Sequence, residues 1–364
     1  MSEKKSILYG EFFTKSAEET FALGRKLARE LKPGHKVFLY GELGVGKTVF
    51  TRGLAQGLGV KEKIKSPTYV YVNLYYLKNG LRLAHFDLYR LSNTADFMSL
   101  GLAEIWADPK TISVLEWGDR IQLADFNLQK FAAIRIRSTK EGRKIWLENL
   151  LQPEKKNISE KFAQVWIDKY CTPIHVLAHS KMVACVAGVI ADCFSQRGIK
   201  VDKVLIEQAA LLHDLVRVVD FKIFDSDKFP YKVPKKAWTI YEKLRLKYHG
   251  RHHANVAAEI LGRAGYPRLA SVIAAHRFLR IFDSDFKNLG WEEKIVYYAD
   301  KRVKHDQIVS LKERLSDGRK RNRGLEPEKD IQCSDVVIMK LEKEIFDLIK
   351  IKPEEISLLV NSVD

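Results

Sequence analysis

The sequence predicts an α/β domain, built on a mixed sheet flanked by helices, followed by an all-helical bundle. Three observations support this fold class. The pattern G-x-x-x-x-G-K-[ST] occupies residues 41–48, between a strand-like run and a helix-like run. Strand-like and helix-like segments alternate up to residue 152, and only helical periodicity follows. With 364 residues, 46% of them hydrophobic, the chain is long enough for two separate cores.

The elements of the first domain follow one another in a regular order. Residues 16–31 place apolar side chains at helical spacing, Lys36–Tyr40 is an apolar run typical of a buried strand, and residues 49–56 again have helical spacing. Further strands are expected over 70–77, 81–87 and 111–115, with a closing antiparallel pair over 131–137 and 144–150. This order predicts the compact α/β sandwich of a P-loop NTPase.

The second half has a different character. Helical periodicity recurs over 176–194, 203–215, 253–262, 269–276, 292–303 and 335–348. The polar stretch 152–157 breaks both periods and is the best candidate for a linker. We therefore expect an ATPase-type domain at 1–152, a linker at 153–172, a helical domain at 173–325 and a helical tail at 326–364.

Composition points to a cytoplasmic protein. No apolar run approaches the roughly 20 residues of a membrane span, and the first residues lack the layout of a secretory signal. The four cysteines are scattered without a C-x-x-C pair, as in reduced proteins. The net charge of +16 leaves an RNA contact open. Its densest basic run, 314–323, is expected to be an exposed loop, either simply solvated or in contact with nucleic acid.

The glycine-rich loop predicts a nucleoside triphosphate site. Its glycines let backbone N–H groups close around phosphate oxygens, and the following helix adds the positive end of its dipole. Lys47 is expected to pair with the β- and γ-phosphates, and the Thr48 hydroxyl to bind Mg²⁺. The expected nucleotide-binding residues of the loop are Gly41, Glu42, Gly44, Val45, Gly46, Lys47, Thr48 and Val49.

Three companion motifs narrow the reaction. Ser66-Pro67-Thr68-Tyr69 is a turn that fits a loop reaching the γ-phosphate. Asp87 and Glu116 each end an apolar strand, at the edge of the sheet where ligands collect. Asp87 suits the magnesium shell, while Glu116 either orients the attacking water or completes that shell.

The loop, S-P-T-Y, the string H-F-D-L-Y-R-L at 85–91 and L-E-W at 115–117 together resemble the TsaE (YjeE) family of ATPases. The resemblance covers roughly residues 6–150. It implies ATP hydrolysis in the synthesis of tRNA threonylcarbamoyladenosine, with TsaD- and TsaB-like partners and only indirect contact with tRNA. It also implies that Lys47, Asp87 and Glu116 are catalytic, that Thr68 lies in a mobile loop and that Trp117 lies beside the nucleotide.

A second set of residues follows in the helical half. His213-Asp214 ends an apolar helical run, His179 precedes it, and His276 and Asp300 follow. Divalent metals accept imidazole and carboxylate together, and an open coordination position lets the ion activate a water. Side chains from several helices can build such a site in a bundle core. Three further histidines outside this set are expected at the surface, namely His175, His249 and His252.

The ordered set resembles the HD-domain phosphohydrolases, whose pattern is H, then HD, then a late D. The resemblance covers about residues 173–305 and implies that His179, His213, Asp214 and Asp300 bind a divalent transition metal (Mn, Fe, Co, Ni or Zn). His253, His276 and Arg217 match positions that bind a second metal or substrate phosphate. Arg277 interrupts the doubled histidine common in the family, so one ion is expected.

These expectations combine into one hypothesis: an ATP-hydrolysing, TsaE-like domain fused to a metal-dependent phosphohydrolase of a phosphate ester. Two alternatives remain open. In the first alternative, the helical half is a non-catalytic module that binds a nucleotide or RNA. In the second, the first half is a small-molecule kinase. No lid-like insertion separates Asp87 from Glu116, which favours the ATPase over the kinase.

Overall fold

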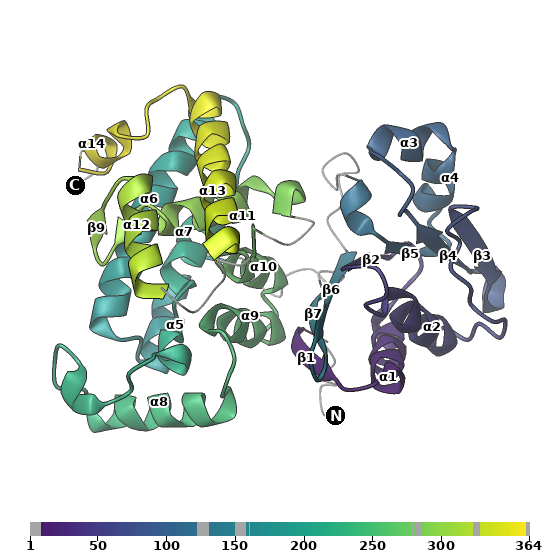
Figure 1. Cartoon of the computed structure of the whole chain (residues 1–364), viewed down its shortest axis with the longest axis horizontal. Coiled ribbons are helices and arrows are strands. Elements are labelled where there is room, and N and C mark those ends of the chain that lie inside the picture. Colours follow the sequence, from purple (N-terminus) through teal and green to yellow (C-terminus); the bar gives the residue numbers. More distant parts are fainter. Residues whose placement is uncertain are drawn as a thin grey trace. The chain divides into compact units, whose positions relative to one another are not determined.

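The computed structural model describes residues 9–121, 131–149, 158, 159, 161–277, 280, 281, 286–322 and 328–361. The chain divides into two compact units (Figure 1). The first comprises Met1–Lys155 with Asp283–Asn288, and the second Lys156–Phe282 with Leu289–Asp364. The predicted linker stretch 152–157 lies outside the described residues.

The first unit is a mixed seven-stranded sheet in the order β1-β7-β6-β2-β5-β4-β3. Strand β2 is parallel to β5 and β6, and β4 is parallel to β5, whereas the outer pairs are antiparallel. This confirms the predicted fold class and adds an edge strand, β1. The elements are β1 (Gly10–Thr14), α1 (Ala17–Leu27), β2 (Lys36–Tyr40), α2 (Lys47–Gly57), β3 (Val72–Tyr76), β4 (Arg82–Asp87), α3 (Thr94–Ser99), α4 (Leu102–Ala107), β5 (Thr111–Glu116), β6 (Phe131–Thr139) and β7 (Gly142–Asn149).

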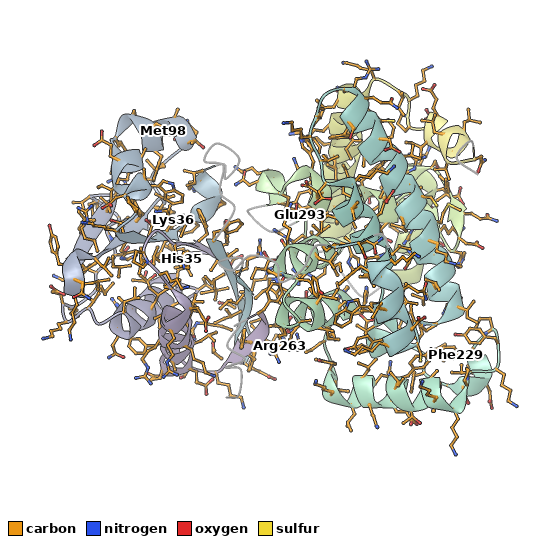
Figure 2. All side chains as sticks on the ribbon, turned by 180° about the vertical axis from the view of Figure 1, so that it is seen from behind. His35, Lys36, Met98, Phe229, Arg263 and Glu293 are labelled. Atoms are coloured by element: carbon orange, nitrogen blue, oxygen red, sulfur yellow. The ribbon has the colours of Figure 1, made fainter. Side chains whose placement is uncertain are left out.

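Helices cover both faces of this sheet, because the central strand is apolar on both sides. Val37 and Leu39 of β2 face the core formed with α1 and α2, while Phe38 and Tyr40 face the core formed with α3 and α4. Helices α1 and α2 lie side by side under the sheet in Figure 1. Figure 2 shows the side chains between these layers, with Met98 on the outer surface of α3.

The parallel strands bring three chemical elements of the sequence to one edge. The glycine-rich loop follows β2, Glu116 ends β5 and Asp87 ends β4. The register pairs Leu39 with Glu116 and Asp87 with Glu116. Since the carboxyl ends of parallel strands meet at one edge, both carboxylates lie beside the loop.

The second unit is a helical bundle built around the long helix α6, which packs against α7, α11, α13 and α14. Its helical character confirms the prediction for this half. The elements are α5 (Phe162–Tyr170), α6 (Ile174–Gln196), α7 (Lys203–Leu212), η5 (Arg217–Asp220), α8 (Lys235–Lys247), α9 (His253–Arg263), α10 (Pro267–Ala275), α11 (Trp291–Asp300), β8 (Val303–Lys304), β9 (Gln307–Ile308), α12 (Leu311–Asn322), α13 (Glu328–Ile349) and α14 (Glu355–Asn361).

Three details differ from the sequence-based expectations. A short hairpin, β8–β9, interrupts the helices, so the half is not purely helical. Helix α5 lies within 153–172, the range assigned to a linker, and packs against α7 and α8. The basic run beginning at Arg314 was expected to be a loop, but it continues as helix α12 to Asn322. Lysine and arginine are good helix formers, and this preference outweighs the single Gly318.

Helix α6 also differs from the expected absence of a long apolar run. Its 23 residues make it long and apolar enough to cross a membrane by length and composition. Half of its most apolar window is buried inside the unit, where its neighbouring helices cover it. This is the pattern of the central helix of a bundle, which is apolar because it is surrounded by protein.

Candidate functional site

The glycine-rich loop has a backbone that requires glycine at defined points. Gly41 has φ +139°, and a Cβ there would lie 2.4 Å from the carbonyl oxygen of Ile136. Gly46 has φ +113° and immediately precedes α2. The Nε of Arg143, on β7, donates to the Val45 carbonyl at 2.8 Å and holds the loop from the side. The local sequence therefore turns the chain from β2 into the amino end of α2, the geometry that binds phosphate.

Lys47 lies folded back into its own loop. Its Nζ donates to the carbonyls of Gly41 and Glu42, both at 2.8 Å, and lies 3.6 Å from the centre of the Trp117 ring. Burial lowers the pKa of Lys47, while the nearby carboxylates, first Glu116, oppose that shift. Trp117 itself has a left-handed backbone, φ 62°, which is uncommon for a residue other than glycine and typical of functional sites.

Glu116 is held by three side chains. The Thr48 hydroxyl donates to its Oε2 at 2.9 Å, Thr51 Oγ1 lies 3.3 Å from its Oε1, and His85 Nε2 lies 2.8 Å from the same oxygen. His85 is fully buried, and its Nδ1 has no hydrogen-bond partner among the residues that the structure describes. A carboxylate oxygen without a proton only accepts, so in that state His85 Nε2 donates to Glu116, and Nδ1 keeps a lone pair when the ring is neutral. Glu116 is thus oriented from behind toward Thr48.

Asp87 makes a separate set of contacts. The hydroxyls of Ser66 and Thr68 donate to its Oδ2 at 2.6 and 2.7 Å, and the backbone N–H of Tyr89 donates to its Oδ1 at 3.1 Å. The S-P-T-Y turn is therefore tied directly to the strand-end carboxylate. This contact brings the two motifs together in the fold.

A cavity of about 310 Å³ lies between these groups. The predicted residues converge there, with three exceptions. Gly41 and Glu42 contribute only the carbonyls that hold Lys47, and the Val45 side chain is buried in the α1–α2 core. The cavity also includes Ser66, from the predicted S-P-T-Y turn, together with Leu43 and Tyr89, which the sequence analysis did not assign to the site. The lining comprises Leu43, Gly44, Gly46, Lys47, Thr48, Val49, Ser66, Thr68, Asp87, Tyr89, Glu116 and Trp117.

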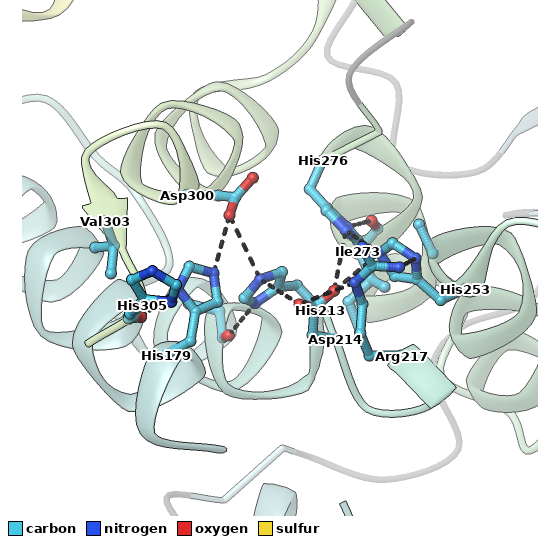
Figure 3. A network of polar contacts seen from close by, with 12 residues as sticks. His179, His213, Asp214, Arg217, His253, Ile273, His276, Asp300, Val303 and His305 are labelled. Atoms are coloured by element: carbon cyan, nitrogen blue, oxygen red, sulfur yellow. Dashed lines mark hydrogen bonds and ion pairs between the residues drawn. The ribbon is translucent and has the colours of Figure 1, made fainter. Parts of the chain in front are cut away.

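The second unit gathers the predicted metal ligands in its core (Figure 3). His179 comes from α6, His213-Asp214 from the end of α7, and Asp300 from the end of α11. The Nε2 atoms of His179 and His213 lie 3.1 and 3.7 Å from Asp300 Oδ1. Ligand atoms of His179, His213 and Asp214 all lie within 4.8 Å of one another. The four residues form one cluster, although they span more than 120 positions of the sequence.

The imidazole rings are oriented by contacts at their outer nitrogens. The Nδ1 atoms of His179, His213 and His276 lie 2.7, 2.7 and 2.6 Å from the backbone carbonyls of His305, Ala210 and Ile273 respectively. A carbonyl oxygen only accepts, so each Nδ1 carries the proton, and each Nε2 presents a lone pair to the cluster when the ring is neutral. Within the described part of the chain, His213 Nε2 is buried and has no hydrogen-bond partner. Histidines that bind a metal through one ring nitrogen commonly donate the N–H of the other to a carbonyl or carboxylate, as these rings do.

A second group of ligands adjoins the first. His253 Nε2 lies 2.8 Å from Asp214 Oδ1 and 3.1 Å from His276 Nε2. Because Asp214 Oδ2 faces His213 at 3.8 Å, the Asp214 carboxylate stands between the two groups. The residues therefore fit either one ion or two ions that share Asp214.

Arg217 lies beside the second group. Its Nη1 pairs with Asp220 and lies 3.0 Å from His253 Nδ1. Asp220, His252 and His253 would form a third ligand group, but Asp220 is already paired with Arg217 and lies 2.7 Å from His253 Nδ1. We therefore assign no ion there.

The electrostatics hold Asp214, Asp300 and His213 in their metal-binding forms, whereas burial would lower the pKa of His179 but its contact with Asp300 raises it. Burial alone would raise the pKa of Asp214, but His213 and His253 hold that pKa well below its usual range. Burial would likewise raise the pKa of Asp300, but Lys301 holds it well below the usual range. Burial lowers the pKa of His213. The cluster thus presents ionised carboxylates beside a neutral imidazole, the forms that bind metals.

Each half of the chain matches a known protein family. A family model for the threonylcarbamoyl adenosine biosynthesis protein TsaE matches residues 14–145, and a model for the HD domain matches residues 176–311. A Treponema pallidum protein named tRNA threonylcarbamoyladenosine biosynthesis protein TsaE is 40% identical over 108 residues, which are 30% of this chain and 78% of the relative. The chain belongs to the TsaE family. It combines this family's domain with a carboxyl-terminal HD domain.

Other relatives with the TsaE name agree. The Streptomyces coelicolor protein is 46% identical over 27% of this chain and 66% of its own length. The Aquifex aeolicus protein is 33% identical over 34% of this chain and 86% of its own length. The crystal structure of YdiB from Bacillus subtilis has 30% identity, covers 38% of this chain and 84% of its own chain, and has a TM-score of 0.32.

Several residues of the TsaE and HD sites escaped sequence reasoning. His85 lies inside the H-F-D string, yet as a sequence letter it cannot be told from a core histidine. Asp220 accepts from both Nδ1 and the backbone N–H of His253, at 2.7 and 3.1 Å, but no motif spacing marks it. His305 acts through its carbonyl, which any residue type supplies. For His85, the sequence offered one signal: a histidine in an apolar strand, two positions before Asp87, the carboxylate that ends the strand.

Proposed function

We propose that the TsaE domain hydrolyses ATP with Mg²⁺, in the synthesis of tRNA threonylcarbamoyladenosine. The convergence of Lys47, Thr48, Asp87 and Glu116 on one cavity after the phosphate-binding loop supports this proposal. TsaD- and TsaB-like proteins are the proposed partners, with tRNA contacted indirectly and the whole chain in the cytoplasm. Copurification from the source cell tests the partnership, and recovery of the chain without TsaB- or TsaD-like proteins would contradict it.

In the proposed reaction the residues have distinct tasks. The loop amides and Lys47, once it swings from its own carbonyls, stabilise charge on the phosphoryl oxygens. Thr48 and the two carboxylates fit a magnesium shell, because hard oxygen ligands suit this ion. Mg²⁺ supplies neutralisation of the β- and γ-phosphate charge when bound. Glu116, held by Thr51 and His85, is placed either to complete the shell or to orient water. Phosphate release from ATP without any acceptor distinguishes an ATPase from a kinase.

Replacing His85 by leucine is expected to lower kcat for ATP hydrolysis roughly 10- to 100-fold, because a buried hydrogen bond to a charged group contributes about 1.5–3 kcal/mol. The KM for ATP should change little, since Lys47 and the loop amides are untouched. His85→Gln, which keeps an N–H near the Nε2 position, should restore most of kcat. Steady-state kinetics check this, and equal losses in both variants would mean that His85 only fills space.

For the HD domain we infer a metal-dependent phosphohydrolase acting on a phosphate ester. The observation that supports this most strongly is the orientation of the His179, His213 and His276 rings, each with Nδ1–H bound to a carbonyl and Nε2 directed inward. A binding module would not need this arrangement. Phosphatase assays on the full chain after loading with Mn, Fe, Co, Ni or Zn test the proposal, and absence of both bound metal and turnover would favour the module.

The proposed ligands divide into two groups. His179, His213, Asp214 and Asp300 hold a first ion, and Asp214 with His253 and His276 offers a place for a second, which the Arg277 departure had argued against. An ion held there supplies an activated water when bound. Arg217, whose side chain is 35% exposed beside Asp214, is placed to receive substrate phosphate. We further propose domain limits at 1–152 for the TsaE domain and 173–325 for the HD domain, with α5 (Phe162–Tyr170) as an added helix before the HD domain and 326–364 as a helical tail.

Asp220→Asn is expected to weaken metal activation roughly 10- to 100-fold, because outer carboxylates fix the tautomer and basicity of a metal-binding histidine. Asp220 accepts from His253 Nδ1 at 2.7 Å, and an asparagine amide holds that ring less firmly. The midpoint of activation by Mn²⁺ checks this result. Asp227→Asn, an exposed change in the neighbouring segment, is the control and should leave the midpoint unchanged. An unchanged midpoint in Asp220→Asn would exclude this role.

A further inference from the structure

A cluster of aromatic rings lies next to the proposed metal centre. Its members are His175 on α6 and the rings of the segment between η5 and α8, namely Phe221, Phe229 and Tyr231, here called the aromatic face. The centre of the His175 ring lies 6.0 Å from Phe221, 5.8 Å from Phe229 and 6.1 Å from Tyr231. His175 was expected to be a plain surface residue, and it is indeed exposed, but it stands at the centre of this cluster.

The aromatic face is continuous with the metal centre. His175 precedes His179 by four residues on α6, so both side chains lie on the same face of that helix. On the other side, the Arg217 guanidinium lies 5.9 Å from the Phe221 ring, while its Nε lies 3.8 Å from Asp214 Oδ2. Arg217 thus lies between the Asp214 carboxylate, which the two ligand groups share, and the ring of Phe221 in the aromatic face.

The aromatic face is built and partly open. The Tyr231 hydroxyl accepts from the Ile174 N–H at 3.1 Å, which fixes the segment to the start of α6. Phe229 packs on Tyr241, whose side chain is buried, and so supports the face from inside. Two apolar residues of the same segments, Ile174 at the start of α6 and Ile223 between Phe221 and Phe229, are 65% and 62% exposed. Exposed apolar side chains gathered beside a polar centre are typical of a ligand-binding surface.

We propose that the aromatic face binds the base of a nucleotide whose phosphate lies at the metal centre, with Arg217 between them. This inference rests on the proposed phosphohydrolase function and names its substrate class. Flat rings stack on aromatic side chains, and a base gains about 1–3 kcal/mol from such stacking. A sugar phosphate without a base would instead need side chains that bind hydroxyl groups, and the face offers rings and apolar side chains. The guanidinium beside Phe221 complements the phosphate charge.

The test uses the full chain carrying Lys47→Ala, so that the ATP site does not contribute, loaded with Mn²⁺. Phosphate release is measured from adenosine and guanosine 5′-monophosphates and from glycerol 3-phosphate. His175→Ala should lower kcat/KM for the nucleotides roughly 5- to 100-fold, the equivalent of one stacking contact, and leave that for glycerol 3-phosphate unchanged. The matched control is His249→Ala, which removes an exposed histidine at the end of α8 and should change neither.

Two results would overturn the inference: equal turnover of all three compounds, or an equal effect of His175→Ala on all of them. If no compound is turned over, the phosphohydrolase proposal fails instead, and equilibrium dialysis of the same nucleotides then decides about the face. Binding that weakens in His175→Ala would retain it as a nucleotide site. Absence of nucleotide binding would exclude it and would favour an apolar protein segment as its occupant.

Discussion

Replacing Asp214 by asparagine is expected to abolish hydrolysis at the HD domain, by at least about 1,000-fold, since an ion supplies several kcal/mol of transition-state stabilisation. Its two carboxylate oxygens face different ligand groups, with Oδ1 2.8 Å from His253 and Oδ2 3.8 Å from His213. Loss of this one charge therefore weakens both groups. Metal analysis and phosphate release on the purified chain check the result.

A second variant, Asp300→Asn, distinguishes the two ligand groups from each other. Asp300 contacts His179 and His213 at 3.1 and 3.7 Å and belongs to the first group alone. If two ions are present, Asp300→Asn should lose one while Asp214→Asn loses both. Asp192→Asn, which changes a half-buried acid on α6 paired with Lys203, is the control for a lost charge and should retain full metal content. Full metal content in Asp214→Asn would contradict the ligand assignment.

Replacing Lys47 by alanine is expected to lower ATP hydrolysis by about 100- to 1,000-fold, the usual cost of removing one preorganised charge-stabilising group. The Lys47 ammonium is the positively charged group of the loop 41–48, and it donates hydrogen bonds to the carbonyls of Gly41 and Glu42. The rate of phosphate release from ATP at saturating Mg²⁺ measures the effect.

Lys110→Ala removes an exposed lysine just before β5, at the opposite end of that strand from Glu116, and serves as its control. It should retain the full rate of ATP hydrolysis. A rate in Lys47→Ala within a few-fold of the parent chain would show that the loop does not hold the reacting phosphates. Thermal unfolding of both variants separates a lost site from a lost fold.

The predicted residues that the structure brings to the expected ends of strands and helices share one property: each is tied to a position in a regular element. Gly41 and Gly46 are needed by a turn with positive φ, and Glu116 ends a strand whose parallel neighbours fix the edge it reaches. His213-Asp214 directly follows α7, whose last residue is Leu212. For such residues, spacing and hydrophobic period together predict the location.

The remaining residues act through tertiary contacts that leave no local pattern. His85 touches Glu116 across two strands, and Asp220 meets His253 from a 3-10 turn 33 residues earlier. His305 contributes only a carbonyl, from a hairpin whose two-residue strands are too short for any period. The aromatic face combines the His175 ring of α6 with rings from an irregular segment. The contacts of His175 with these rings could therefore not be predicted from hydrophobic period or motif spacing.

The central claim is that one chain holds two separate sites of phosphate chemistry. It is tested most directly by measuring phosphate release from ATP and from a phosphate ester in Lys47→Ala and Asp214→Asn side by side. We predict that Lys47→Ala loses ATP hydrolysis and keeps ester hydrolysis, and that Asp214→Asn does the reverse. Loss of both activities in either variant, or of neither in both, would contradict the account.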